Sequence, residues 1–245
     1  MPREIDAAEL FNTAFRRTLD GYRIVTSLIL YAMHGAPSAA AGLSESAVPL
    51  MEEIVAVERR PDAIAAVTQA TMADAHSAVQ AASIVFMHSS LDAAALDYCR
   101  VTAAVRPLAW EKYVLEEKFP LRRILRNSTA ELVGEEVAAF MKRLSNRSLP
   151  QKIAALHDVC KPGSAQILPS YRFDSARIKH FDERRHDIVH GDGLGSLLSV
   201  VDIVEEVEYL RLTNVYLSAL VTNAYGLKLD RRAFSVGQSS IGNFK

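Results

Sequence analysis

Hydrophobic residues recur at helical spacing along most of this chain. The clearest run lies near the C-terminus, where apolar positions follow one another at steps of three, four or seven residues: Leu197, Val201, Val204, Val207, Leu210, Leu217, Val221 and Ala224. Such spacing forms one apolar face of an α-helix. The alternation of apolar and polar residues that marks a β-strand is nowhere sustained long enough to predict one. The pattern therefore predicts an all-α protein.

Glycine, proline and capping residues divide this pattern into separate helices. A first helix is expected over residues 5–34, because Gly35 supplies a stop. Ser44 is expected to cap a short helix that reaches about residue 60. From Pro61 the chain contains no further glycine or proline until Pro107. This stretch therefore predicts either one helix of about 40 residues or two.

The second half of the chain is punctuated in the same way. Breaks are expected at Pro107, Pro120 and Ser128, and further helices from Pro150 to about Lys161, from Asp174 to His190, and beyond the glycine-rich stretch 191–195. We divide the chain into accessory N-terminal helices over residues 1–60, a helical core over residues 61–230, and a polar tail over residues 231–245 that is expected to fray.

Composition is that of a cytoplasmic globular protein. Hydrophobic residues make up 49% and charged residues 23%. The formal net charge of −1 excludes a general electrostatic attraction to nucleic acid or membrane, so a polyanion would need a local cluster of Lys and Arg. The spacing of Cys99 and Cys160 matches no disulfide framework, which indicates a reducing compartment. Both side chains are expected to be buried as small hydrophobic residues. The apolar run over residues 24–33 is too short to span a bilayer, and no membrane partner is expected.

Candidate chemistry is concentrated in one segment, Arg184 to His190. Cleaving a phosphodiester without a metal ion requires a group that can take and give protons, and histidine titrates near neutral pH. It also requires a fixed cation for the phosphate, which the planar fork of arginine supplies. Arg185 and His190 are five positions apart, so in a regular helix their side chains diverge by about 140°. The glycines that follow from Gly191 predict a helix end, where the two could converge on one anion.

Residues 185–191, which read Arg-His-Asp-Ile-Val-His-Gly, resemble the signature of the HEPN superfamily. That signature is an Arg, usually followed by a polar residue, with four to six residues between the Arg and a His. Arg185 and His190 fit with four residues between them, Arg184 would fit with five, and His186 takes the polar position. The resemblance extends over about residues 80–228, and only residues 184–191 carry specificity.

The resemblance implies an all-α, HEPN-like helical bundle, here with an N-terminal helical extension. It implies a homodimer that pairs two Arg/His motifs across a shared cleft, and a metal-independent endoribonuclease of the toxin or phage-defence kind, without a cofactor. RNA would be the substrate, and a cognate antitoxin or regulatory partner is expected. Arg185, His190 and His186 would be catalytic, and Arg184 and Asp187 would bind substrate. A non-catalytic HEPN-like binding module is the alternative within the same superfamily.

Two metal sites are alternatives from the residues themselves. His186 and His190 share a helical face, with Asp182 one turn earlier, so this helix could hold a metal ion. The segment also resembles the zincin motif His-Glu-x-x-His, although Asp187 stands where that motif has glutamate.

The second metal alternative is a phosphohydrolase. Residues 154–162 are similar to the central motif of HD-domain phosphohydrolases, centred on His157 and Asp158. That family has another histidine about one helix earlier, whereas here none lies between His88 and His157.

A purely structural role for the Arg/His segment is also open, with solvated arginines and a helix-terminal His190. Several other residues could assist an RNA site. Ser90, Asp92 or Asp97 could orient His190 or pair with Arg185. Trp110 or Tyr113 could stack on a base or simply pack. Three basic groups could follow an RNA backbone: Arg122, Arg123 and Arg126; Lys142, Arg143 and Arg147; Arg177 and Lys179.

Overall fold

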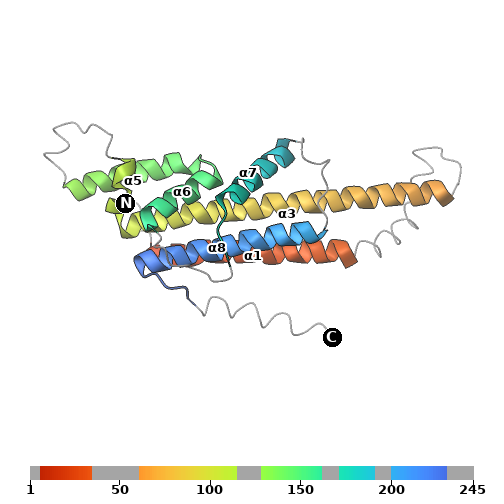
Figure 1. Cartoon of the computed structure of the whole chain (residues 1–245), viewed down its shortest axis with the longest axis horizontal. Coiled ribbons are helices and arrows are strands. Elements are labelled where there is room, and N and C mark those ends of the chain that lie inside the picture. The colour runs from red at the N-terminus through yellow and green to blue at the C-terminus, as the bar shows by residue number, and fades with distance from the viewer. Residues whose placement is uncertain (1–5, 35–60, 115–127, 162–170, 191–199, 231–245) are drawn as a thin grey trace. The chain divides into compact units, whose positions relative to one another are not determined.

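The regular structure of the chain is helical. The computed structural model describes residues 6–34, 61–114, 128–161, 171–190 and 200–230, and within these ranges it contains no strand. The elements are α1 (Ala7–His34), α3 (Pro61–Val105), the 3-10 helix η1 (Pro107–Tyr113), α5 (Thr129–Ser145), α6 (Leu149–Cys160), α7 (Ser175–His190) and α8 (Val200–Tyr225) (Figure 1). The predicted all-α class is confirmed.

The helices begin and end where the sequence provides caps. The amide of Ala176 donates to Asp174 Oδ1 over 2.8 Å at the start of α7. Ser128 and Glu131 form a reciprocal capping box at the start of α5. Lys161 ends α6 with a φ of 46°. The stretch that begins at Pro61 is one continuous helix of 45 residues, so the first of its two predicted forms is the one observed.

Three predicted segments fall outside the described residues. They are the short helix after Ser44, the glycine-rich stretch 191–195 and the polar tail over residues 231–245. Of the apolar positions predicted for the last helix, Val207, Leu210, Leu217 and Val221 are buried, whereas Val204 is 46% exposed. Ala224 is exposed as well.

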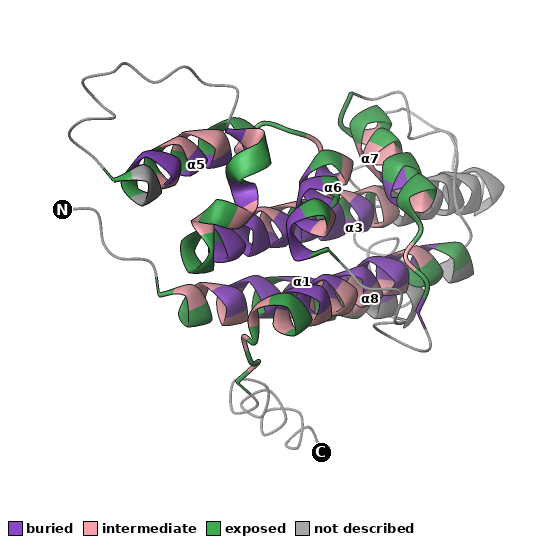
Figure 2. Ribbon diagram, turned by 60° about the vertical axis from the view of Figure 1, so that its left-hand side comes forward, coloured by how far each residue is buried: buried purple, intermediate pink, exposed green. Residues whose placement is uncertain are grey.

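Contacts group the chain into two compact units. The first comprises residues 1–19, 89–182 and 210–245, and the second comprises residues 20–88 and 183–209. This grouping differs from a division at residue 60, because the first part of α1 belongs to the same unit as the second part of α3. In that unit the phenol of Tyr98 donates to Asn214 Oδ1 over 2.9 Å, and Asn214 Nδ2 donates to the carbonyl of Phe15 over 3.2 Å. Buried residues run along α1, α3, α6 and α8 (Figure 2).

Two acids of α3 are held by ion pairs inside the first unit. Lys152 is 2% exposed, and its Nζ lies 2.6 Å from both carboxylate oxygens of Asp92. Asp97 accepts from Arg17 over 2.6 Å and from Arg100 over 3.0 Å. Both acids, which the sequence allowed to orient His190 or to pair with Arg185, are thus held by cations of their own unit.

The part of α3 from Ala78 to Val105 is long and apolar enough to cross a membrane by length and composition. A core helix of a bundle meets the same criterion. Asp92 and Asp97 lie within this stretch, and each is paired with a cation from another helix.

Candidate Arg/His site

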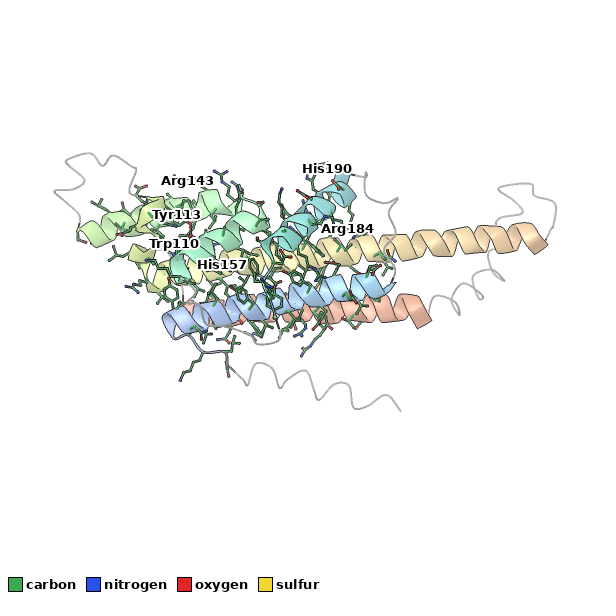
Figure 3. The ribbon with its side chains drawn as sticks, in the orientation of Figure 1. Trp110, Tyr113, Arg143, His157, Arg184 and His190 are labelled. Atoms are coloured by element: carbon green, nitrogen blue, oxygen red, sulfur yellow. The ribbon has the colours of Figure 1, made fainter. Side chains whose placement is uncertain are left out.

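The Arg/His segment forms the second half of α7. The helix begins after Asp174 and ends at His190, as the sequence predicts. Ile178 and Phe181, one turn apart in its first half, are each 1% exposed and anchor the helix. Figure 3 shows His190 at the C-terminal end of α7. The position suits a cation, since the last carbonyl groups of a helix carry partial negative charge.

The two histidines of the segment lie side by side at the surface. The ring centroids of His186 and His190 are 4.2 Å apart at an interplanar angle of 50°. Both residues are exposed, as is Asp187 between them. Residues four positions apart in a helix face the same side, which explains the contact. A substrate in solvent can therefore reach both imidazoles.

The two arginines of the segment differ in their partners. Both are half-buried. Arg185 Nε is shielded from solvent and has no hydrogen-bond partner among the described residues. Arg184 is already engaged in an interaction within the protein. An unpaired buried donor costs about 1–3 kcal/mol, so such groups are uncommon and call for an explanation. Arg185 therefore has a buried donor that no described residue satisfies.

His157 occupies a different environment from the histidines of α7. Its ring meets Phe173 edge-on at 4.8 Å and Tyr216 at 5.6 Å between centroids. Its Nε2 is buried without a partner among the described residues. Burial lowers the pKa of His157 below its ordinary value, because the charged ring would lose much of its hydration.

Asp158, next to His157, is held by two donors. Its Oδ2 accepts from Lys112 Nζ and, over 2.6 Å, from Tyr113 Oη. The bonds from Lys112 and Tyr113 lower the pKa of Asp158. Across the described ranges, no three His, Cys, Asp or Glu residues are grouped as a metal ion would require. That statement covers both the His157 region and the combination of Asp182 with His186 and His190.

Of the auxiliary residues, Lys142, Arg143, Arg147 and Lys179 are exposed and Arg177 is half-buried, whereas Arg122, Arg123 and Arg126 lie outside the described residues. Trp110 is fully buried. Tyr113 lines a surface groove together with Phe140, and sequence reasoning missed Phe140 because nothing in its local pattern separates it from a packing residue. Cys99 and Cys160 are buried free thiols, as predicted.

Comparison with family models, with curated proteins and with solved structures finds no match for this chain. Its function is therefore inferred from its own residues.

Proposed function

We propose that this chain is a metal-independent endoribonuclease of the HEPN type, in which Arg185 and His190 act on the RNA phosphodiester. The observation that carries the proposal is the pair of exposed imidazole rings of His186 and His190, with centroids 4.2 Å apart, on the same half-helix as Arg185. The guanidinium of Arg185 would hold the phosphate, because a guanidinium recognises phosphate through several hydrogen bonds at once.

The chemistry needs only groups that this segment contains. The 2′-oxygen of the RNA attacks the adjacent phosphorus while a base removes its proton. The bond from phosphorus to the 5′-oxygen breaks, and an acid protonates that oxygen. The products are a 2′,3′-cyclic phosphate and a 5′-hydroxyl end, and no metal ion or cofactor takes part. Histidine can serve as base and as acid because it titrates near neutral pH.

Each residue of the segment has a role in this proposal. His190 is the general acid/base, and His186 supports it as the neighbouring polar ring. Arg185 holds the phosphate and stabilises the charge that develops on its oxygens. Arg184 and Asp187 bind the flanking substrate.

A homodimer is part of the same proposal. Two motifs facing each other across a two-fold axis would supply one histidine for each proton transfer. Exposed apolar side chains are concentrated in the unit that contains the motif, where the described residues include Ile24, Leu28, Phe86, Val189 and Val204, each 43–50% exposed. Val189 immediately precedes His190 and would lie in the proposed dimer interface.

The biological setting rests on the HEPN resemblance. A cytoplasmic toxin or defence effector that cleaves RNA needs a means of control, so a cognate antitoxin or regulatory partner belongs to the proposal.

The test is cleavage of a single-stranded RNA by the full-length protein in excess EDTA, with analysis of the new ends. The expected result is cleavage at an unchanged rate, with 2′,3′-cyclic phosphate ends. Activity that disappears with EDTA and returns with a divalent ion would instead favour the phosphohydrolase alternative at His157 and Asp158. Binding of RNA without any cleavage would favour a non-catalytic binding module.

A further inference from the structure

A groove on the first unit lies where η1, α5 and α6 meet. It encloses about 310 Å³, at the lower end of the range of about 300–1,000 Å³ that is typical of ligand sites. Its lining combines aromatic, cationic and small residues: Tyr113, Phe140, Arg143, Leu144, Arg147, Gln151, Ala154 and Ala155. None of these residues belongs to the Arg/His segment.

The aromatic part of the groove is a fixed platform. The rings of Tyr113 and Phe140 stack with centroids 4.9 Å apart at 29°. Trp110 is fully buried and contacts both rings, at 5.5 Å and 5.9 Å between centroids. The phenol of Tyr113 donates to Asp158, which also binds Lys112. These contacts hold the platform in place. The side chains of the platform would therefore lose little conformational entropy when a ligand stacks on them.

The charged part of the groove is cationic. Arg143 lies over the Phe140 ring, with its guanidinium carbon 5.9 Å from the ring centroid. Arg147, four residues further along the chain, is exposed and lines the same groove. Asp158, an acid close to the platform, is held by Lys112 and Tyr113. The groove therefore attracts an anion.

The polar edge of the groove contains a side chain, Gln151, that can form a hydrogen bond to a ligand. Gln151 lies in the first turn of α6, and its side-chain carbonyl accepts from the amide of Ser148 over 3.2 Å. Its NH₂ group can still donate. Ala154 and Ala155 line the adjacent wall with small side chains.

We propose that this groove binds single-stranded RNA, with a base stacked on the platform of Tyr113 and Phe140 and the neighbouring phosphates on Arg143 and Arg147. Aromatic stacking next to a basic track is the general solution for binding single-stranded nucleic acid. An acidic peptide would match the cations but would leave the platform and the Gln151 donor without a purpose. The naming of RNA rests on the proposed function. The groove would then be a second contact that holds substrate apart from the catalytic segment.

The test measures RNA binding by the full-length protein that carries His190→Ala, so that the probe is not cut. The probe is a fluorescent single-stranded RNA of about ten nucleotides, a length within the site sizes of single-strand binders, and its anisotropy is followed at several salt concentrations. Phe140→Leu keeps the apolar volume and removes the ring. Arg143→Gln combined with Arg147→Gln removes both cations. Arg16→Gln, an exposed arginine on α1, is the matched control.

The two groove variants should fail in different ways. Loss of one stacked base should weaken binding about tenfold in Phe140→Leu, with the salt dependence unchanged. Loss of two phosphate contacts in the double arginine variant should reduce the slope of log K against log salt by about 1.4, at about 0.7 per contact on a single strand. Arg16→Gln should bind as the parent does, and duplex RNA should bind more weakly than the single strand.

Two results would overturn the groove. The first is that both groove variants bind RNA with the same affinity and salt slope as Arg16→Gln. The second is that the variants bind an acidic polyglutamate probe more weakly while their affinity for RNA is unchanged. Circular dichroism checks folding, and the double variant decides alone if Phe140→Leu is unfolded, because both of its arginines are exposed. If the unmodified protein binds RNA through the groove but never cleaves it, the proposed function fails and the groove stands. If it cleaves RNA and the groove variants bind normally, only the groove fails.

Discussion

The imidazole rings of His186 and His190 lie with their centroids 4.2 Å apart at the exposed end of α7. One chain therefore presents two groups that can carry a proton, on the same half-helix as Arg185, whose buried Nε has no partner among the described residues. This arrangement allows two ways of supplying the acid and the base. Either one chain holds both the acid and the base, or the second proton transfer uses His190 of a second copy. The proposed function commits to the second copy.

Mixed dimers should show whether the cleft is shared. Under exchange conditions, wild-type protein is mixed with increasing amounts of His190→Ala, and specific activity is measured. If both copies of His190 serve one cleft, activity should fall roughly as the square of the wild-type fraction, because an isologous interface places the same residue of each copy in that cleft. A strictly linear fall, or an active monomer on size-exclusion chromatography, would show that each chain holds a complete site.

Arg185→Ala should reduce the rate constant of cleavage by about 10²-fold or more, since a charge-stabilising donor at a reaction centre contributes on that scale. Arg185→Lys should recover little of that loss, because an ammonium group cannot reproduce the planar fork of donors. Single-turnover kinetics on a defined RNA measure both. Arg184→Ala is the matched neighbour and should act mainly on KM. A large loss of kcat in Arg184→Ala with normal cleavage by Arg185→Ala would move the motif by one residue.

His157 should make the protein less stable as the pH falls below neutrality. Burial lowers the pKa of His157 below 6.5, so the folded state favours the neutral ring. Its contribution is complete above the unfolded value and is lost as the pH falls from 6.5 towards the lowered pKa, because the unfolded chain binds the proton more readily there. Asp158 also has a lowered pKa, but its window lies below 3.8.

Urea unfolding of wild type and His157→Phe tests that expectation. The free energy of unfolding of wild type should fall relative to that of the variant between about pH 8 and about pH 5. His180→Gln, at an exposed position of α7, is the control and should follow wild type. A constant difference between wild type and His157→Phe over this range would contradict the account of His157.

The two cysteines should resist thiol reagents in the native protein. Cys99 is fully buried and Cys160 is 8% exposed. Burial raises the pKa of Cys160 to about 12, and it raises the pKa of Cys99 as well. Because the thiolate is the reactive form, neither should react within minutes at about pH 8, and both should react in denaturant. Release of chromophore from an aromatic disulfide reagent measures the reaction. One equivalent released by the folded protein would show that a thiol is accessible.

Much of the fold could be predicted because its determinants are local. Asp174 and Ser128 mark helix starts through hydrogen bonds to backbone amides two or three residues away. Pro61 and the absence of any further breaker before Pro107 define the length of α3. Such signals act within one turn, so they can be read from neighbouring letters.

The partners of polar side chains could not be predicted in the same way. Asp92 pairs with Lys152, and Asp97 pairs with Arg17, across large separations in sequence. Position and composition alone allowed these acids to face the Arg/His segment. Which cation pairs with each acid depends on how the helices pack. The sequence pattern of one helix shows only that a residue lies on its buried face and does not show what lies opposite. The grouping of residues into two units follows tertiary contacts in the same way.

The candidate site was predictable in position and not in detail. The spacing of Arg185 and His190 and the following glycine predicted that the segment closes a helix, and α7 ends at His190. The burial of Arg185 Nε depends on what surrounds it in space and leaves no local pattern. Phe140 escaped notice for the same reason, since its neighbours in the groove are Tyr113 and Arg143.

The central claim, that His190 carries out RNA cleavage, is tested most directly by single-turnover cleavage in excess EDTA with three proteins. These are wild type, His190→Ala, and His180→Ala, which removes an exposed histidine from the same helix. Loss of a general acid/base should slow cleavage by about 10²–10⁴-fold in His190→Ala, while His180→Ala cleaves as wild type does and all three keep the same helical content. Equal rates for wild type and His190→Ala, or equal losses in both variants, would contradict the claim.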